Sequence, residues 1–193
     1  CSLSEYLRMK DNRKVENQLG QQQSHYAQKT DSAKPIESRI NLGCGDDQRD
    51  GWYNVDIIPE LDPDEVVDLN KTPWPWPDSY FEEVLASNVL EHLDDQHTAL
   101  QELHRITKPG GRIEVRVPHP NSPGFWADPT HTSPLCEQTF THPMAPRWEV
   151  TEVHVSRVRF GRLFPERVAL RLADHVGHVV DEITIILRAA LSS

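Results

Sequence analysis

The sequence predicts an α/β domain in which helices cover the faces of a mostly parallel β-sheet, and three observations support this fold class. Short apolar segments typical of strands alternate with segments whose apolar residues have helical spacing. A glycine turn at 43–45 follows the first strand segment, where an open α/β sheet carries a ligand loop. The length of 193 residues suits one such domain. We expect it over residues 36–193, after a polar extension at 1–35 that is partly helical or disordered.

The first half of the domain holds most of the expected strands. Three prolines make residues 72–78 a loop, and two more shorten the connection at 58–64, which has no room for an ordinary crossover helix. Asp94 or Asp95 can cap a helix that Pro109-Gly110-Gly111 would end. Strands are expected over 38–42, 53–57, 65–69 and 81–87.

The second half begins with a strand of mixed character. Residues 112–117 alternate charged and apolar side chains, which predicts one buried face, although a central parallel strand is normally apolar on both. Residues 151–160 predict a strand whose apolar phase slips between Val155 and Val158, as at a β-bulge. The remaining expected elements are a helix over 165–176 closed by Gly177, within a helical insertion at about 162–178, and a last strand over 180–187.

The net charge of −10 is concentrated near the middle of the chain. Residues 44–102 hold sixteen Asp and Glu residues but only Arg49 and Lys71, so this region would repel a nucleic-acid backbone and no nucleic-acid partner is expected. A later group of arginines could meet an anionic acceptor, although a solvated surface explains it better. Its members are Arg157, Arg159, Arg162, Arg167 and Arg171.

Compartment and partners follow from what the sequence does not contain. No apolar run approaches the roughly 20 residues that span a bilayer, and no charged-then-apolar leader opens the sequence. Cys1, Cys44 and Cys136 do not form a disulfide framework, which agrees with a reducing compartment. We therefore expect a soluble, cytoplasmic protein with no membrane partner.

The glycine turn and two strand-end acids suggest a nucleoside site. Glycines let a backbone approach a ligand closely, but a dinucleotide site would have a third glycine where this chain has Gln48, and an acid about 20 residues on. Asp56 follows Gly45 by only eleven residues, which argues against a nicotinamide enzyme. At the end of the second strand, Asp56 could accept both ribose hydroxyls, and Asp68 could accept an adenine amino group beside Leu69.

Six ordered motifs give the sequence a specific resemblance. They are Asn41-Leu-Gly-Cys-Gly, Tyr53-Asn-Val-Asp-Ile, Val67-Asp-Leu-Asn, Pro75-Trp-Pro-Asp-Ser-Tyr-Phe, Ser87-Asn-Val-Leu-Glu-His-Leu and Lys108-Pro-Gly-Gly-Arg. Over about residues 38–145 the chain resembles the methyltransferases that use S-adenosylmethionine (SAM), in particular the methyltransferase type 11 group. It is most similar to a compact branch in which a short loop replaces most of the first helix.

The resemblance implies a Rossmann-like class I methyltransferase fold, SAM as cofactor and S-adenosyl-L-homocysteine (SAH) as product. The glycine turn would lie beneath the methionine moiety, Asp56 would hold the ribose, and Asp68 with Leu69 would frame the adenine. Asn88 would face the methionine end, with Glu91 and His92 at the mouth of the site. The cofactor-binding residues implied are Gly43, Cys44, Gly45, Asp56, Ile57, Asp68, Leu69, Asn88 and His92.

Candidates for acid–base work lie in the loop that follows the strand at 112–117. Methyl transfer mainly needs alignment and exclusion of water, and a general base helps when the acceptor is a hydroxyl or a protonated amine. His131 and His119 are the expected bases, with Asp128 as an orienting partner, because the compact branch carries a similar Asp-Pro-Thr-His stretch. Phe125 and Trp126 either line the acceptor pocket or anchor the loop by packing.

A zinc site is the alternative use of these histidines. His119, His131, Cys136 and His142 could supply ligands, but their spacing matches none of the common paired patterns. We therefore expect no metal.

The sequence therefore predicts a SAM-dependent methyltransferase acting on a small-molecule or sugar-containing acceptor. The alternative is a non-catalytic, methyltransferase-like SAM-binding module with a regulatory or assembly role, because no base is assured. With the helices after the first two strands curtailed, we expect one sheet face to need cover from residues 1–35, from the 165–176 helix or from the second subunit of a homodimer.

Overall fold

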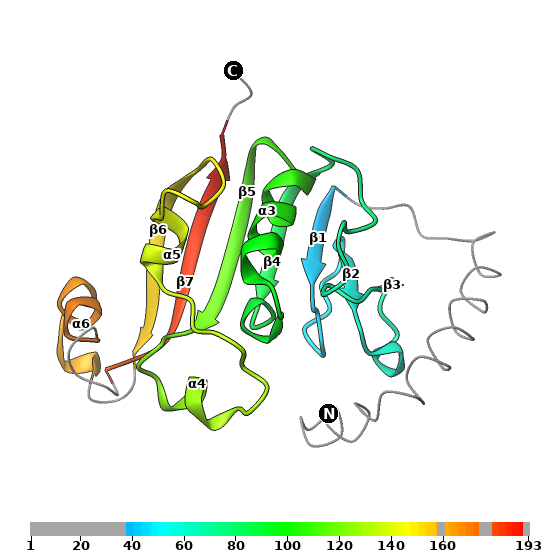
Figure 1. Ribbon diagram of the computed structural model, residues 1–193. Coiled ribbons are helices and arrows are strands. Elements are labelled where there is room, and N and C mark those ends of the chain that lie inside the picture. The colour runs from blue at the N-terminus through cyan, green and yellow to red at the C-terminus, as the bar shows by residue number, and fades with distance from the viewer. Residues whose placement is uncertain (1–37, 158–160, 174–178, 191–193) are drawn as a thin grey trace, which may run out of the picture. The chain divides into compact units, whose positions relative to one another are not determined.

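A seven-stranded mixed sheet forms the centre of the domain, in the order β3-β2-β1-β4-β5-β7-β6 (Figure 1). The computed structural model describes residues 38–157, 161–173 and 179–190. Only β7 runs against the other strands, since both of its pairings are antiparallel. The predicted α/β fold class is confirmed. The strands are β1 (Arg39–Leu42), β2 (Tyr53–Asp56), β3 (Glu65–Val66), β4 (Phe81–Ser87), β5 (Thr107–Pro118), β6 (Trp148–Arg157) and β7 (Val180–Ala189).

The part of the chain that the structure describes holds few helices, most of them short. Asp95 caps the longest of them, α3, by accepting the backbone N–H of Thr98 at 3.0 Å, which confirms the predicted start. No helix in the described residues is long and apolar enough to cross a bilayer. The helices are α3 (Gln96–Ile106), α4 (Pro123–Ala127), α5 (Glu137–Thr141) and α6 (Glu166–Ala173), with 3₁₀ turns η2 (Pro59–Leu61), η3 (Leu90–His92) and η4 (Gly161–Leu163).

Two predicted boundaries were wrong. The predicted helix end at Pro109-Gly110-Gly111 lies inside β5, because Thr107 already pairs with Phe81 and a register shift follows. The third strand stops at Val66 rather than Leu69, since the chain turns at Asp68, whose carbonyl accepts the Lys71 N–H. Helix α6 is described as far as Ala173, and its predicted end at 176 with the closing Gly177 lies outside the described residues.

Strand β6 begins earlier than predicted, at Trp148 instead of residue 151, and its described part runs to Arg157. Its register shifts between Ser156 and Arg157, close to the predicted slip between Val155 and Val158, and again between Val150 and Glu152. Residues 158–160 lie outside the described part, as does the whole extension at 1–35. The last strand matches its prediction and is longer by two residues.

The main core lies between α3 and one face of the sheet. Alternate residues of β4 and β5 point to this face, and the buried side of α3 packs on them. Both tryptophans of the proline-rich loop join this core, with their rings 6.1 Å apart between centroids. In Figure 1, α3 and α5 both lie on the near side of the sheet. The buried contributors from these elements are Trp74, Trp76, Val84, Ala86, Ala99, Leu100, Leu103, Ile106, Ile113, Val115 and Val117.

The opposite face of the sheet is polar where β5 crosses it. Glu114 accepts a hydrogen bond from Arg112 Nη2 at 2.7 Å and one from Arg116 Nε at 2.8 Å, so the charged residues of the alternating strand neutralise one another. Among the described residues no α-helix follows β1 or β2, as expected. On the same face, the two residues in register with Glu114, Leu85 and Ile186, are buried, so the expectation that this face needs cover stays a prediction.

Helix α6 lies beside the edge strand β6, at the left of Figure 1. Ala169 and Leu172 pack with Val155, Val179 and Val180 in a small second core. Glu166 Oε1 also accepts the backbone N–H of Val155 at 3.0 Å. The helix therefore holds the edge of the sheet through both apolar and polar contacts.

Candidate active site

The glycine turn forms at the carboxyl end of β1, as predicted. Gly43 and Gly45 have φ angles of 61° and 49°, in the left-handed region that favours glycine. The Cys44 N–H donates to Val55 O at 3.0 Å, which ties the turn to β2. A Cβ on Gly43 would stand 2.5 Å from Val89 Cγ2, whereas one on Gly45 would meet no atom within 4 Å. The turn is therefore tightly packed on one side and open on the other.

Asp56 ends β2 and holds the glycine turn in place. Its Oδ2 accepts the Gly45 N–H at 2.8 Å, and its Oδ1 accepts the Ile58 N–H at 2.9 Å. The residue is only 7% exposed, and Ile57 beside it is half-buried. Each oxygen keeps a second lone pair, so the carboxylate can still accept a hydrogen bond from a ligand. Its predicted role with ribose stays a prediction.

Asp68 and Leu69 follow β3 next to this site. The Val67 N–H donates to Asp56 O at 2.9 Å, which brings the two strand ends together. Asp68 accepts the Asn70 N–H at 3.1 Å and lies 3.6 Å from Lys71 Nζ, so its contacts are local. Leu69 is buried, and its carbonyl accepts the indole N–H of Trp74 at 3.0 Å.

Asn88 follows β4 with a φ angle of 51° and an exposed side chain. Its N–H donates to Arg116 O at 2.8 Å, and its Nδ2 lies 3.4 Å from Glu182 Oε2. The backbone therefore bends sharply here before η3. This bend directs the chain from the sheet edge into a buried group of titratable side chains.

That group, the Glu91 cluster, consists of Glu91, His92, Asp128, Thr130 and His131. One ligand atom each of Glu91, His92 and His131 lies within 4.8 Å of the other two. The rings of His92 and His131 meet edge to face, and His131 Nε2 lies 3.8 Å from Asp128 Oδ2. The structure thus places the predicted base beside its predicted orienting partner and adds two residues from η3.

Glu91 is the member of the cluster whose importance the sequence reasoning missed. It is 1% exposed, and neither carboxylate oxygen has a hydrogen-bond partner among the described residues. Burial raises the pKa of this carboxyl to about 7, and the negative charges of Glu182 and Asp128 act in the same direction. The signal available was an acid next to a histidine directly after a buried strand, in Leu90-Glu91-His92.

Neighbouring acceptors fix the protonation of both imidazoles when they are neutral. His131 Nδ1 lies 2.7 Å from Phe125 O, and a carbonyl can only accept, so Nδ1 carries the proton. Thr130 donates its hydroxyl proton to Asp128 Oδ1 at 2.6 Å and must therefore accept from His92 Nδ1 at 2.9 Å. Although burial opposes it, hydrogen bonding from Thr130 lowers the pKa of Asp128. Both rings consequently present an unprotonated Nε2.

His119 lies apart from the Glu91 cluster. It is buried after β5, and its Nδ1 accepts the Asn121 N–H at 3.1 Å. It lines a second cavity of about 320 Å³ with Cys136, Arg167 and Arg171. The predicted role of His119 as a base stays a prediction.

The four residues first considered for zinc do not form one site. His142 and Cys136 line another pocket, in which neither His131 nor His119 takes part. Phe125 is buried, with its ring centroid 4.9 Å from that of His131, so it packs on the candidate base. Trp126 is 72% exposed and donates to Pro120 O.

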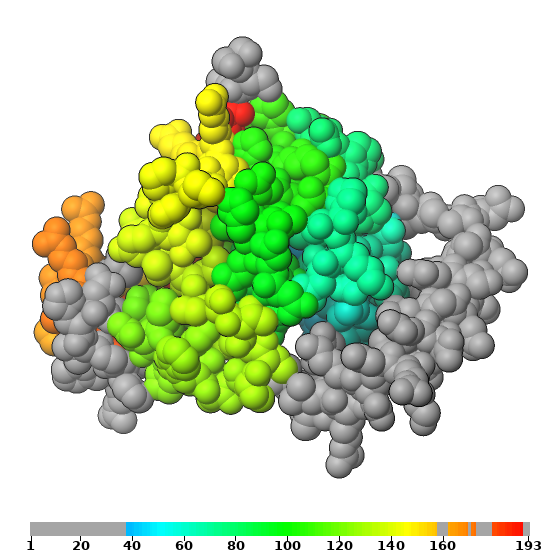
Figure 2. All heavy atoms as spheres, in the orientation of Figure 1, coloured from blue at the N-terminus to red at the C-terminus, as the bar shows by residue number. Residues whose placement is uncertain are grey.

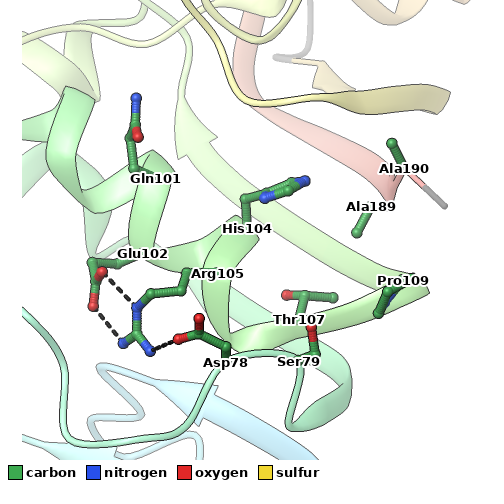
Figure 3. Close-up of a pocket in the computed structure, with 10 residues that line it drawn as sticks. All are labelled: Asp78, Ser79, Gln101, Glu102, His104, Arg105, Thr107, Pro109, Ala189 and Ala190. Atoms are coloured by element: carbon green, nitrogen blue, oxygen red, sulfur yellow. Dashed lines mark hydrogen bonds and ion pairs between the residues drawn. The ribbon is translucent and has the colours of Figure 1, made fainter. Parts of the chain in front are cut away.

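A further pocket of about 430 Å³ opens at the other edge of the sheet, where β5 begins (Figure 3). Arg105 extends between Glu102 and Asp78 in this pocket, with hydrogen bonds of 2.7 and 2.8 Å. Arg105 also donates to the carbonyls of Trp74 and Trp76. These groups already satisfy one another and fasten the proline-rich loop to α3, so we assign this pocket a structural role.

The functional residues instead gather at the carboxyl edge of the parallel strands. The glycine turn follows β1, Asp56 ends β2, η3 follows β4, and the loop with α4 follows β5. Figure 1 shows this last loop below the carboxyl end of β5, and in Figure 2 its atoms form a continuous mass below α3. Open α/β sheets bind ligands at this edge.

Comparisons with known proteins find similarity to methyltransferases. Residues 53–115 match the family model described as a methyltransferase domain. The chain is 32% identical over 79 residues to the ubiquinone/menaquinone biosynthesis C-methyltransferase UbiE of Escherichia coli, a match that covers 41% of this chain and 28% of that enzyme. The chain thus spans under a third of the length of this relative.

Two solved structures share the fold at low sequence identity. A SAM-dependent methyltransferase from Archaeoglobus fulgidus has a TM-score of 0.54 at 18% identity, over 86% of this chain and 91% of that one. The [4+2]-cyclase SpnF has a TM-score of 0.57 at 16% identity, over 81% and 77%. Residues 53–115 thus match a methyltransferase domain, and the domain has the fold of these SAM-dependent methyltransferases.

Proposed function

We propose that this domain binds SAM at the glycine turn and transfers its methyl group to a small-molecule or sugar-containing acceptor. The observation that carries the proposal is the bond between Gly45 N–H and Asp56 at the edge that also holds the Glu91 cluster. The residues that would bind the nucleoside and the residues that would act as acid or base therefore lie at the same edge of the sheet.

The site fits the cofactor in two respects. The open space over Gly45 leaves room for the methionine moiety against bare backbone, where a side chain would otherwise stand. The spare lone pairs of Asp56 can accept ribose hydroxyls without breaking its bonds to the turn. When bound, SAM supplies an electrophilic methyl group on a sulfonium. Asp68 and Leu69 would orient the adenine end of SAM, and Asn88 would orient its methionine end.

This chain's own contribution to methyl transfer is alignment and proton removal. His131 would accept the acceptor's proton at Nε2, because its Nδ1–H is held by Phe125 O. Asp128, 3.8 Å from that nitrogen, would stabilise the imidazolium that results. The α4 loop would keep water from the reacting atoms, where alignment alone can be worth roughly 7–11 kcal/mol.

The cavity beside His119 supports an acceptor with an acidic group. Arg167 and Arg171 of α6 line it, and they are members of the arginine group singled out in the sequence. A carboxylate or phosphate there would meet both guanidinium groups, which bind planar anions through paired hydrogen bonds. UbiE methylates carbon in its own pathway, and nothing about its acceptor is transferred to this chain.

Calorimetric titration with SAH, followed by turnover of methyl-labelled SAM with a pool of small metabolites, tests the proposal. We expect 1:1 binding of SAH and label transfer to a small acid, with transfer but not binding lost in His131→Gln. Binding without any transfer would favour the non-catalytic module, and SpnF shows that this fold also serves other chemistry. Absence of SAH binding would refute the proposal.

A further inference from the structure

Glu91, His92 and His131 have the composition and burial of a metal site, and we propose that they bind a divalent transition-metal ion, Zn²⁺ by preference. Two imidazole nitrogens and one carboxylate oxygen form a ligand set common to catalytic zinc and to other divalent transition metals. The ligands come from η3 and from the α4 loop. The positions of these three residues along the sequence do not match the spacing of the common zinc-binding motifs.

The strongest evidence is the unsatisfied carboxylate. Glu91 is 1% exposed, and neither oxygen has a hydrogen-bond partner among the described residues. No lysine or arginine of the described part is found in an ion pair with it. A buried carboxylate without a partner is costly, and a cation held at its oxygens would remove that cost.

The two imidazoles are oriented as ligands. His131 donates from Nδ1 to a backbone carbonyl, and His92 donates from Nδ1 to Thr130, which in turn donates to Asp128. Metal-binding histidines almost always donate their other N–H to a carbonyl or to a carboxylate-linked group, which fixes the ring and its tautomer. The Nε2 lone pair of His131 thereby faces away from its Nδ1 bond, and one ligand atom of His92 lies within 4.8 Å of the ligand atoms of His131 and Glu91.

The distances allow binding with a small adjustment. Ligand atoms around a tetrahedral zinc ion, each at about 2.0–2.2 Å, are about 3.4 Å apart. The three atoms here lie within 4.8 Å of one another, so side-chain rotation of about 1 Å would close the site. Asp128 Oδ2, 3.8 Å from His131 Nε2, is near enough to become a further ligand or to hydrogen-bond a bound water.

Three protein ligands leave an open coordination position. Structural zinc sites are closed by four protein ligands, whereas an open site takes water or a substrate oxygen. At this edge the open position would receive an oxygen of the methyl acceptor. With the ion bound, His131 Nε2 would be a ligand and could not accept the acceptor's proton, and the ion itself would favour deprotonation of the acceptor oxygen. This consequence rests on the proposed methyltransferase function, whereas metal binding itself does not.

The test is titration of the full chain, freed of metal by a chelator, with Zn²⁺ and with Co²⁺. We expect 1:1 binding at micromolar or lower Kd, a rise in melting temperature with Zn²⁺, and visible absorption by the Co²⁺ form. Glu91→Gln should abolish 1:1 binding, and Thr130→Val should weaken it about 10–100-fold because it frees the His92 ring. His154→Gln, an exposed histidine on β6, is the matched control and should bind as the unaltered chain does.

Two outcomes would overturn the metal site. One is the absence of 1:1 binding in the unaltered chain, and the other is equal affinity in Thr130→Val, Glu91→Gln and the control, which would indicate surface histidines. If Glu91→Gln does not fold, the metal affinity of Thr130→Val relative to that of the His154→Gln control decides whether the site exists. SAH titration of the same metal-free sample is read separately, so failure of the cofactor site and failure of the metal site are distinguishable.

Discussion

Gly43 packs its bare Cα against the side chain of Val89, so the glycine turn after β1 and the chain leaving β4 are in direct contact. The residues expected to hold SAM and the Glu91 cluster are therefore parts of one packed edge.

Gly43→Ala should lower the free energy of unfolding by about 2–4 kcal/mol, from left-handed strain and overpacking together. The added Cβ would stand 2.5 Å from Val89 Cγ2. Gly45→Ala is the control, because its φ is also positive but its Cβ would meet open space, and about 1–2 kcal/mol is expected. Urea unfolding measures both. Equal losses in the two variants would contradict the packing argument.

Arg105→Met should destabilise the domain by about 3 kcal/mol, because Glu102 would be left buried without its cation. Lys108→Met is the matched control, since its ion pair with Glu82 is exposed and worth about 0–1 kcal/mol. Urea unfolding midpoints compare them. Recovery of part of the loss on adding Glu102→Leu would support the mechanism, and a loss as small as that of the control would refute it.

Glu102 should also make stability sensitive to acid. Hydrogen bonds from Arg105 hold the pKa of this carboxyl below its ordinary value of 4.5. A carboxyl whose pKa is lower in the folded than in the unfolded chain stabilises the fold. This stabilisation is complete above the pKa of the unfolded chain and is lost as the pH falls through the pKa of the folded chain. Below pH 4.5 the unfolding free energy should fall more steeply in the unaltered chain than in Glu102→Gln. Parallel pH profiles would exclude this residue as the source.

Cys44 should be unreactive in the folded protein. Its side chain is 4% exposed, and burial, assisted by the charge of Asp56, raises the pKa of the thiol to about 12. Iodoacetamide at pH 8 should modify the half-buried Cys136 and leave Cys44 intact, as peptide mass spectrometry can show. Labelling of Cys44 at the rate seen in urea would mean that the glycine turn opens readily.

Asp68→Asn should weaken SAH binding about 10–100-fold while leaving the melting temperature of the ligand-free protein unchanged. The residue makes only local contacts, with Asn70 and Lys71, so its loss has little structural cost. Calorimetry and thermal melts give the two readouts. Unchanged SAH affinity would remove Asp68 from the site.

The sheet could be predicted because its strands are marked by local patterns. The strand segments that became β1, β4 and β5 were marked by apolar or alternating runs, and the helix cap was narrowed to Asp94 or Asp95. The early start of β5 was not predictable, because Thr107 pairs with Phe81 across the sheet and no local signal competes with Pro-Gly-Gly. A strand boundary that depends on pairing with a distant strand cannot be predicted from the local sequence alone.

The candidate site was predictable only in part, for a similar reason. His131 and Asp128 belong to one short stretch, and their proximity could be expected. Glu91 and His92 approach them from another loop, so no spacing along the chain relates the two pairs. Among the described residues the Glu91 carboxylate has no hydrogen-bond partner. This property arises only when the chain folds, so it cannot be predicted from the type of residue.

The bond between Glu166 and Val155 N–H has a consequence for association. The unpaired backbone N–H groups of an edge strand can form β-sheet hydrogen bonds with a strand of another molecule. Natural proteins prevent this with charged side chains or with a helix that covers the edge. Here one carboxylate from α6 occupies a donor that an incoming backbone would need. Intermolecular strand addition along β6 is thus hindered at Val155.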